Sequence, residues 1–321
     1  MKAIQMTQSG GPEVLKLVEI EEPIVGENEV LVNLYYAGVN PFETYIREGG
    51  YAFYTPDFPY TPGFDGAGKV EQVGSRVKDF SIGDRVFVAS TLSKTSGTYA
   101  EKVVCEEDAL RKIPDDLSYA EAAAIGVPAT TAYKALFQRG RLKKGEKVLI
   151  HGASGGVGTL AVQMAKQIGA YVIGTAGSQE GLEAVQKNGA DLVLNHSEEE
   201  YLEQVKDVDL IIEMLANKNL TKDLQIINKY GRIVVVGNRG TLEFDPRQIM
   251  AKEIDLLGLA IWNYHPEDYQ TSLDEIAKML NQQTLKPAIG RIYPLEKAAQ
   301  AQYDIIHSKA NGKILLEIQE E

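Results

Sequence analysis

The sequence has few of the side chains from which metal sites and disulfides are built. Its 321 residues include one cysteine, Cys105, and four histidines. A single cysteine excludes an internal disulfide and any zinc site made of four cysteines. The histidines, at positions 151, 196, 265 and 307, are scattered, and none stands at a ligand-like spacing from Cys105. Zinc catalysis needs about three protein ligands, so a metal is not expected.

Long apolar runs and excess positive charge are also missing. No run approaches the roughly 18 apolar residues of a membrane span, and the N-terminal MKAIQMTQSGG lacks the apolar core of a signal peptide. The net charge of −12 disfavours nucleic acid or an anionic membrane as the main partner. The one basic cluster, RGRLKKGEK at 139–147, is interpreted as a solvated helix-to-strand connection, with an RNA-contacting patch as the alternative. With no disulfide possible, a cytoplasmic location is expected.

The pattern of predicted secondary structure changes along the chain. Residues 1–110 favour short strands broken by glycine and proline turns, which is typical of a small antiparallel barrel or sandwich. From residue 147 strands and helices alternate, and short apolar runs such as KVLIHGA and RIVVVG predict a parallel sheet buried on both faces. A capping box, Ser118 with Glu121, opens an alanine-rich helix, and a longer helix is expected near 267–283.

The last strand, GKILLEI at 312–318, has no evident place in the parallel sheet and is expected to return to the N-terminal β domain. The first domain is then discontinuous. The predicted domains are residues 1–122 plus 263–321 and residues 123–262, with a cleft between them.

KVLIHGASGGVGTLAVQMAKQIG, residues 147–169, gives the strongest signal. A strand enters a turn with glycines at 152, 155 and 158, and an amphipathic helix leaves it. Glycines allow backbone N–H groups to approach a pyrophosphate, and the helix N-terminus adds partial positive charge. Together with the strands that follow, this pattern predicts dinucleotide binding. His151, directly before the loop, is expected to be a packed or hydrogen-bonded strand residue.

The next strand ends without an acid. In YVIGTAGSQEG, residues 171–181, no carboxylate appears before Glu180. An acid here would accept hydrogen bonds from the ribose 2′-OH and repel a 2′-phosphate. Gly174, Thr175 and Ser178 are instead expected to leave room and offer small neutral donors, which favours NADP(H). The candidate cations for the phosphate are Lys187, His196 and Lys313, and the sequence does not choose between them.

Several segments together resemble one enzyme family. They are GVNPFETYIR (38–47), YTPGFDGAGKVEQVG (60–74), GDRVF (83–87), AAAIGVPATTAYKAL (122–136), HGASGGVG (151–158), IIEMLAN (211–217) and GKILLEI (312–318). In these segments, which span essentially the whole chain, the sequence resembles the zeta-crystallin-type NADPH:quinone oxidoreductases of the medium-chain dehydrogenase/reductase superfamily. Zinc-dependent relatives carry a cysteine near position 40 and Gly-His-Glu near 63–65, where this chain has Asn40 and Gly63-Phe64-Asp65.

The resemblance implies a fold and an assembly. The expected fold is α/β, with a Rossmann-type doubly wound parallel sheet domain, a GroES-like, mainly antiparallel β catalytic domain, and an active site in the cleft between them. It also implies a homo-oligomer, either a dimer or a tetramer.

The resemblance also implies site residues. Tyr45 matches a tyrosine that faces both cofactor and substrate, and Asn40 and Tyr51 match residues near the quinone. The cofactor-binding positions are Ser154, Gly155, Gly156 and Val157 for the pyrophosphate, Gly177, His196 and Asn219 on the adenosine side, Val236, Gly237, Asn238 and Arg239 after the strand RIVVVG, and Leu259, Ala260 and Ile261 against the nicotinamide.

Physical chemistry supports the catalytic roles but leaves alternatives. A phenol and an amide can donate hydrogen bonds to a quinone oxygen as it gains negative charge. Alternatively, Asn40 and Tyr45 satisfy a turn. The aromatic-rich segment at 42–60 either stacks a planar substrate or forms the core of an excursion from the barrel. Arg47 and Glu43 are expected to be exposed ion-pairing residues.

Without a metal, the substrate must be electrophilic enough to accept hydride unaided. The leading hypothesis is therefore an NADPH-dependent, metal-free reductase of quinones, preferably planar ortho-quinones, with transfer from nicotinamide C4. One alternative is an enone or alkenal double-bond reductase that uses the same cofactor. A second is a non-catalytic nucleotide- or RNA-binding protein.

Overall fold

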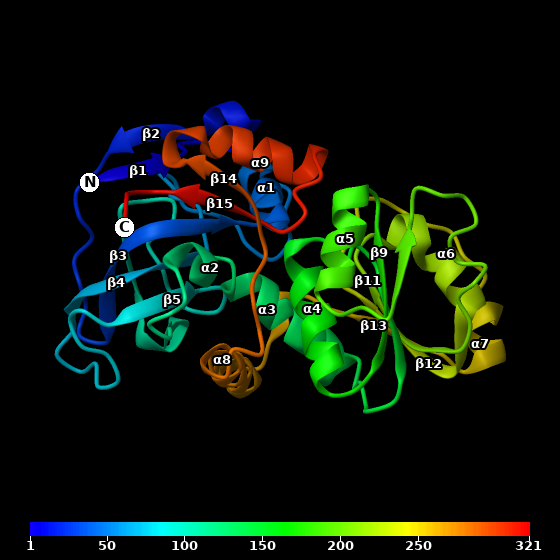
Figure 1. The fold of residues 1–321 in the computed structure, drawn as a ribbon. Coiled ribbons are helices and arrows are strands. Elements are labelled where there is room, and N and C mark those ends of the chain that lie inside the picture. The colour runs from blue at the N-terminus through cyan, green and yellow to red at the C-terminus, as the bar shows by residue number, and fades with distance from the viewer. The chain divides into compact units, whose positions relative to one another are not determined.

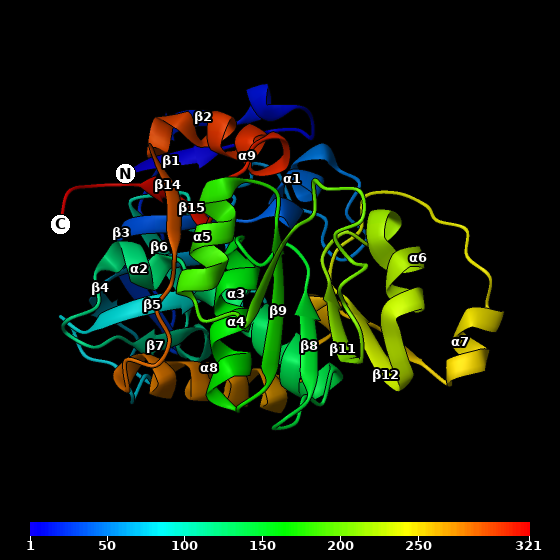
Figure 2. The same cartoon turned by 45° about the vertical axis from the view of Figure 1, so that its right-hand side comes forward.

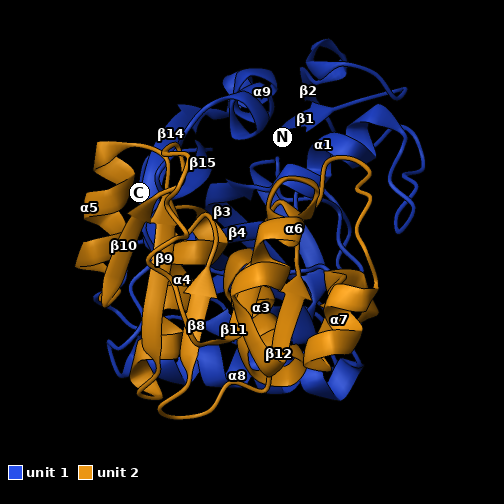
Figure 3. Cartoon of the chain, turned by 90° about the vertical axis from the view of Figure 1, so that its right-hand side faces the viewer, with its two compact units in different colours: residues 1–127, 264–321 blue, residues 128–263 orange.

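The computed structural model describes all residues, 1–321, and the chain divides into two compact units. The first comprises residues 1–127 and 264–321, and the second comprises residues 128–263 (Figure 3). The division lies slightly later than the expected limits at 122/123 and 262/263. One reason is that the segment before it is held by the first unit, where Val127 N donates a hydrogen bond of 2.6 Å to the buried Asp65 Oδ1.

The first unit is built on a mainly antiparallel sheet in the order β14-β15-β3-β4-β5-β7, with β6 also paired to β3 and a separate ribbon of β1 and β2. Its strands are β1 (Lys2–Gln5), β2 (Lys16–Glu19), β3 (Glu29–Val39), β4 (Asp65–Val73), β5 (Arg85–Ala89), β6 (Lys102–Glu106), β7 (Leu110–Lys112), β14 (Ile289–Pro294) and β15 (Lys313–Glu317). The C-terminal strand β15 pairs antiparallel with β3, which confirms its predicted return, and both chain ends lie in this unit (Figure 1).

Strand β3 organises this sheet because it pairs with β4, β6 and β15. Its register with β4 shifts twice, which lets one long strand bend between partners. Val32 and Leu34 on this strand are fully buried and pack in a core with Val86 and Val103. Removing such side chains would cost about 1–5 kcal/mol each, depending on the volume lost.

The helices of the first unit are short except for one. They are α1 (Pro41–Glu48), α2 (Tyr119–Ala123), α8 (Pro266–Asn281) and α9 (Ala298–His307), while α3 (Gly126–Tyr133) crosses into the second unit; single 3-10 turns lie at Pro12–Val14, Glu107–Ala109 and Leu295–Lys297. The predicted capping box opens α2: Glu121 N donates to Ser118 Oγ at 3.2 Å, and Ser118 N donates to Glu121 Oε2 at 3.0 Å.

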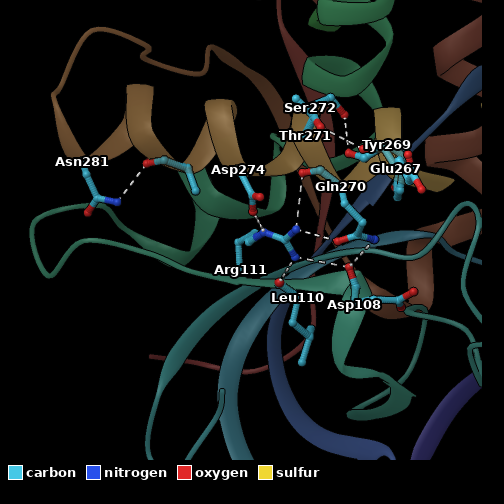
Figure 4. A network of polar contacts seen from close by, with 11 residues as sticks. Asp108, Leu110, Arg111, Glu267, Tyr269, Gln270, Thr271, Ser272, Asp274 and Asn281 are labelled. Atoms are coloured by element: carbon cyan, nitrogen blue, oxygen red, sulfur yellow. Dashed lines mark hydrogen bonds and ion pairs between the residues drawn. The ribbon is translucent and has the colours of Figure 1, made fainter. Parts of the chain in front are cut away.

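Polar contacts fasten α8 to the sheet (Figure 4). Arg111 on β7 donates from Nε to Asp274 Oδ1 at 2.7 Å and from Nη2 to Gln270 Oε1 at 2.6 Å. Gln270 in turn donates to the backbone oxygen of Asp108 at 3.2 Å. The buried Tyr269 hydroxyl donates to the Ala89 oxygen at 2.9 Å. These bonds explain why a helix so late in the chain belongs to the first unit.

The second unit is a parallel sheet in the order β10-β9-β8-β11-β12-β13. The strands are β8 (Lys147–Ile150), β9 (Tyr171–Ala176), β10 (Leu192–Asn195), β11 (Val208–Glu213), β12 (Ile227–Val235) and β13 (Asp255–Gly258). The strand order reverses between β8 and β11. The chain therefore extends the sheet in both directions from that reversal, which is the doubly wound arrangement that the resemblance implied.

Helices cover this sheet, and the central strands are fully buried. Helices α4 (Gly156–Gln167) and α5 (Gln179–Lys187) pack on β8, β9 and β10, while α6 (Ala216–Ile226) and α7 (Arg247–Lys252) pack on β11 and β12 (Figure 2). A π-helical segment at Lys134–Arg139 and a 3-10 turn at Ile261–Asn263 complete the unit. Leu149, Ile211 and Ile233 are fully or almost fully buried in its core. No helix of the chain is both long and apolar enough to cross a membrane.

Candidate active site

The glycine-rich loop after β8 has the geometry of a phosphate-binding turn. Gly152 adopts the left-handed conformation with φ of 58°, and Gly155 caps α4. At Gly158 a Cβ would lie 2.3 Å from the Gly152 oxygen and 2.6 Å from Ala153 Cα, so only glycine lets the helix approach the loop this closely. At Gly155 the nearest atom would be 3.4 Å away, an ordinary contact. Gly158 is therefore required for packing of the helix against the loop, whereas Gly155 is not.

The loop is anchored to the neighbouring strand, and the start of the helix is partly exposed. Gly152 N donates to Thr175 Oγ1 at 3.1 Å, and Ala153 N donates to the Thr175 oxygen at 2.8 Å. Thr159 N makes a bond to the Gly155 oxygen at 2.9 Å, which belongs to the helix proper. The N–H groups of the preceding turn are the ones that a helix leaves for an anion.

The end of β9 corrects one expectation. Gly174 was expected to leave room for a ligand, but a Cβ there would lie 2.5 Å from Val185 Cγ1 and 3.0 Å from Ala153 Cβ. Its missing side chain is thus required by the packing of α5 against the strand. Thr175 is buried, and its hydroxyl is used inside the unit by Gly152 N. Ser178, partly exposed, caps α5 by accepting a hydrogen bond from Gly181 N at 3.2 Å.

The three candidate cations lie in different places. His196 is exposed and directly follows β10, with its backbone N donating to the Ala176 oxygen at 3.0 Å, so it stands beside the end of β9. Lys187 is in the last turn of α5, at the opposite end of that helix from Ser178. Lys313 is buried in the first unit and bound to Asp65 at 2.8 Å. Only His196 adjoins Gly177 and Ser178.

Two further loops meet after β11 and β12. Ala216 N donates to the Gly237 oxygen at 3.0 Å, and a Cβ at Gly237 would lie 2.3 Å from the Met214 oxygen. Asn217 N donates to Asn238 Oδ1, and Arg239 N donates to Asn217 Oδ1, each at 3.0 Å. These reciprocal bonds hold the two loops as one surface.

All of the predicted cofactor residues in this unit follow the strands of the parallel sheet. Ser154, Gly155, Gly156 and Val157 follow β8, Gly177 follows β9, His196 follows β10, Asn219 lies on α6 after β11, Val236, Gly237, Asn238 and Arg239 follow β12, and Leu259, Ala260 and Ile261 follow β13. Parallel strands place their carboxyl ends at a common edge of the sheet, so these residues gather along one line beside the strand reversal. Apart from Ile261, they are partly or fully exposed.

Asn40 occupies a different setting from the one expected. It caps α1, is 2% exposed, and donates from Nδ2 to Glu43 Oε1 at 3.1 Å and to Asp65 Oδ2 at 2.9 Å. Its Oδ1 accepts a hydrogen bond of 2.6 Å from Lys313 Nζ. Both amide hydrogens are therefore already donated to carboxylates, as in the alternative in which Asn40 satisfies a turn.

Glu43 and Arg47 are buried, so the expectation that they are exposed is wrong, whereas Arg47 does form an ion pair, with Glu48 Oε1 at 2.9 Å. Glu43 accepts a hydrogen bond of 2.6 Å from the Tyr99 hydroxyl, and burial raises its pKa to about 7 although Tyr99 and the Lys313 charge oppose this. Arg47 donates from Nε to Gln302 Oε1 at 2.8 Å and from Nη1 to the Gly10 oxygen at 2.7 Å. The partners lie too far along the chain for a local pattern to reveal them.

The positions that match the zinc ligands of relatives do not fit zinc. Asn40 and Asp65 both bind the Lys313 ammonium, and Phe64 stands between the glycine and the acid. Zinc prefers thiolate, imidazole and carboxylate ligands, and a fixed ammonium at this point would repel the ion. The chemistry of this chain is therefore derived without a metal step.

Aromatic side chains gather around Tyr45 and Tyr51. The Tyr45 and Tyr51 rings lie 6.2 Å apart, and Tyr51 also contacts Phe42 at 5.9 Å and Phe53 at 5.5 Å between ring centroids. Phe53 is 49% exposed, whereas Tyr45 and Tyr51 are half-buried. The hydroxyl of Tyr45, in contrast to the Asn40 amide, has no hydrogen-bond partner within the chain. The group offers a partly open face of planar rings.

Known proteins resemble the whole chain. Residues 156–278 match a family described as zinc-binding dehydrogenase, and residues 26–115 match the alcohol dehydrogenase GroES-like domain. A human protein named quinone oxidoreductase is 46% identical over 324 residues, which cover 98% of this chain and 97% of that protein.

Solved structures share the fold with different cofactors. Escherichia coli quinone oxidoreductase complexed with NADPH superposes with a TM-score of 0.88 at 29% identity, covering 99% of this chain and 100% of that one. An NAD-dependent alcohol dehydrogenase superposes with a TM-score of 0.89 at 28% identity and the same coverage. Because both superpose equally well, the fold alone does not select the cofactor or the substrate.

Proposed function

The chain belongs to the quinone oxidoreductase family of the medium-chain dehydrogenase/reductase superfamily, and on this premise we propose that it reduces quinones with NADPH and without a metal. The observation that carries the proposal is the gathering of the predicted cofactor residues along the carboxyl edge of the parallel sheet. When bound, NADPH supplies a hydride from nicotinamide C4 to the quinone. The side chains and backbone of the chain must bind the cofactor and position the quinone.

The phosphate loop would hold the pyrophosphate. Ser154, Gly155, Gly156 and Val157 form the turn at the start of the twelve-residue helix α4, whose first N–H groups and dipole favour an anion. Leu259, Ala260 and Ile261 follow β13 and would present an apolar surface to the nicotinamide. The Lys134 ammonium donates to the Ala260 oxygen at 3.0 Å, which fixes this stretch of backbone.

The preference for NADPH rests on charge at the end of β9. No carboxylate stands there to repel a 2′-phosphate. Gly177 and Ser178 are partly exposed beside the exposed His196, which offers a donor and, when protonated, a positive charge. We therefore assign the ribose phosphate to this corner of the sheet.

On the substrate side, Tyr45 is the group proposed to act directly. Its hydroxyl would donate to the quinone oxygen as negative charge develops, and Tyr51 would stack with the planar acceptor. Asn40 would act as a positioning residue, since its amide ties the start of α1 to Asp65 and Lys313. Solvent would supply the proton that completes the hydroquinone. Planar ortho-quinones suit the aromatic face best.

The proposal includes a homo-oligomer in the cytoplasm. Strand β13 is the last in its sheet, so one side of its backbone has no strand partner in the chain, and such an edge suits pairing with a second copy. Sedimentation equilibrium would distinguish a monomer from a dimer or tetramer.

The deciding experiment measures oxidation of NADPH and NADH with ortho-quinones, para-quinones and enones, on protein treated with a chelator. Rapid NADPH oxidation by quinones that is indifferent to the chelator is the expected result. Turnover with enones alone would move the function to double-bond reduction. Loss of turnover on chelation would overturn the metal-free mechanism, and tight NADPH binding with no turnover would favour a binding protein.

A further inference from the structure

A buried group of ionisable side chains lies directly behind the cofactor edge of the second unit. His151 sits between β8 and the phosphate loop, Glu213 is the last residue of β11, and Asp223 lies on α6. His151 is 2% exposed, and both acids have no exposed surface. None of the three is among the residues proposed to touch cofactor or substrate, so their burial needs another explanation.

The three side chains contact one another. His151 Nε2 lies 2.8 Å from Asp223 Oδ1 and 3.5 Å from Glu213 Oε2. On its other side, Glu213 Oε1 accepts a hydrogen bond from Leu215 N and one of 3.2 Å from Asn219 Nδ2. The group thus connects the phosphate loop, through His151, to the turn that leads into α6, through Glu213.

Two oxygens of this group lack donors. Glu213 Oε2 and Asp223 Oδ2 are buried, no N–H or O–H of the chain is placed to donate to either, and the two carboxyl groups each bring an oxygen within 4.8 Å of the other and of the His151 ring. Two ionised carboxylates so close together repel strongly in a buried site, whereas one proton between them satisfies both oxygens.

The surrounding charges do not remove the need for that proton. The Lys222 ammonium on α6 acts to lower the pKa of Asp223, but it lies over the ring of Tyr201 at 5.5 Å. The Tyr201 hydroxyl is buried, and burial with the nearby acids raises its pKa to about 12, so it stays neutral. Burial lowers the pKa of His151 and raises those of Glu213 and Asp223 to about 7.

A divalent cation is the competing occupant, because one imidazole and two carboxylates can bind a metal. The 2.8 Å between His151 Nε2 and Asp223 Oδ1 is an ordinary hydrogen-bond length. With zinc–ligand bonds of about 2.1 Å, that separation would give an angle of about 84° at the metal, compressed from the roughly 109° of the tetrahedral geometry that zinc prefers. A proton fits the geometry without this compression.

We propose that His151, Glu213 and Asp223 form a clamp that shares one proton between the two carboxyls and positions the loops of the dinucleotide site, so that losing the proton weakens cofactor binding. The proposal rests on the proposed function of that site. With the proton present, Glu213 and Asp223 attract each other and hold β11 against α6. As the pH rises and the proton leaves, two negative charges face each other, and the turn carrying Asn219 loosens.

Glu213→Gln tests this because the amide resembles the protonated carboxyl. The glutamine oxygen can still accept from Leu215 N and Asn219 Nδ2, and its NH2 adds the donor that the pair of carboxyls lacks. The dissociation constant for NADPH would be measured by fluorescence titration from pH 6 to pH 9. As the pH rises, the dissociation constant of the wild type should increase relative to that of the variant. The total increase should be about tenfold for each unit by which NADPH binding raises the pKa of the pair. The variant keeps tight binding at high pH. Glu203→Gln removes an exposed acid from the same unit and should follow the wild type.

Infrared spectroscopy of the protein without cofactor provides a second measurement. A carbonyl band of a protonated, buried carboxyl that shifts in heavy water should appear at neutral pH in the difference spectrum between the wild type and Glu213→Gln, and likewise between the wild type and Asp223→Asn; any band from Glu43, whose pKa burial also raises to about 7, is common to all three proteins and cancels. The band tests the shared proton independently of the cofactor. If the band is present but NADPH does not bind, the proposed function fails and the shared proton is still supported. Parallel pH dependence in wild type and Glu213→Gln, absence of the band, or one equivalent of metal that Asp223→Asn removes would each overturn the proposal.

Discussion

Each unit of this protein buries a group of charged side chains near its proposed site, and the two groups are completed differently. In the first unit, all four carboxylate oxygens of Glu43 and Asp65 receive donors, from Asn40, Tyr99, Val127 and Lys313. In the second, Glu213 and Asp223 each keep one oxygen that no protein donor reaches. The first network contains an ammonium that pairs with Asp65, and in the second a proton is left to take that place.

This difference separates a fixed framework from a titratable one. The Lys313 ammonium is carried on β15, so the first network depends on the chain's return from its C-terminus. The position of that ammonium is set by the fold. A proton shared by two acids does exchange with solvent, and its presence depends on pH. Loss of the C-terminal strand should therefore unbalance the first network, whereas the charge of the second depends on pH; in the first, Glu43, whose pKa burial also raises to about 7, is the group that titrates.

The largest effect is expected when the ammonium is removed. In Lys313→Met, the buried Asp65 carboxylate keeps two neutral donors, the backbone N–H at Oδ1 and the Asn40 amide at Oδ2. It loses the cation that balances its charge. Breaking a buried ion pair in this way costs about 3–5 kcal/mol, which urea denaturation would measure. Lys16→Met, on an exposed site of β2, should change the unfolding free energy little. Equal losses in both variants would mean that Lys313 contributes no specific charge pairing.

The second prediction concerns the tyrosine beside the first network. Tyr45→Phe removes a hydroxyl with no partner in the chain, so stability should be kept while quinone turnover falls about 10²–10³-fold, the usual loss for one donor to a developing oxyanion. NADPH affinity should change little. Tyr303→Phe, on the exposed face of α9, serves as the matched control. Unchanged turnover in Tyr45→Phe would remove this hydroxyl from the mechanism.

Two glycines of the phosphate loop allow packing and cofactor binding in the second unit to be tested separately. Gly158→Ala forces a Cβ to 2.3 Å from the Gly152 oxygen, so the unfolding free energy should fall by about 1–3 kcal/mol. Gly155→Ala meets only an ordinary contact at 3.4 Å, so the chain should stay stable while NADPH affinity drops about tenfold. Thermal denaturation and fluorescence titration of both variants make the comparison. A reversed pattern would show that the loop geometry does not divide the two roles in this way.

Much of the fold could be predicted from short-range sequence signals. The apolar runs around 147–176, the glycine loop and the Ser118–Glu121 capping box each correspond to an element in the structure, because each is decided by a few neighbouring residues. The return of residues 313–317 to the first sheet was also predictable, since that strand had no place in the parallel sheet.

The buried networks could not be predicted in the same way. Glu43 and Arg47 resemble exposed residues of an amphipathic helix, and the partner of Arg47 is Gln302, far along the chain. Gly174 indicated space for a ligand, but α5 fills that space with Val185. One signal was available and was not used: Glu213 ends the apolar run LIIE, and an acid in such a strand must have a partner.

The smallest expected effect concerns how the unfolding free energy depends on pH. In the native chain the pKa values of Glu213 and Asp223 are raised to about 7, whereas in the unfolded chain they are near their ordinary values of about 4. The native state therefore binds more protons between about pH 4 and pH 7, so the unfolding free energy falls as pH rises through that window and stays lowered above it.

Glu213→Gln should remove part of that fall, about 1–2 kcal/mol between pH 5 and pH 8 in urea denaturation. Glu43, whose pKa burial also raises to about 7, is present in both proteins, so the difference between them isolates the pair in the second unit. Glu203→Gln should keep the wild-type slope because its carboxyl is exposed. If Glu213→Gln kept that slope too, the shared proton would not be what distinguishes the second network from the first.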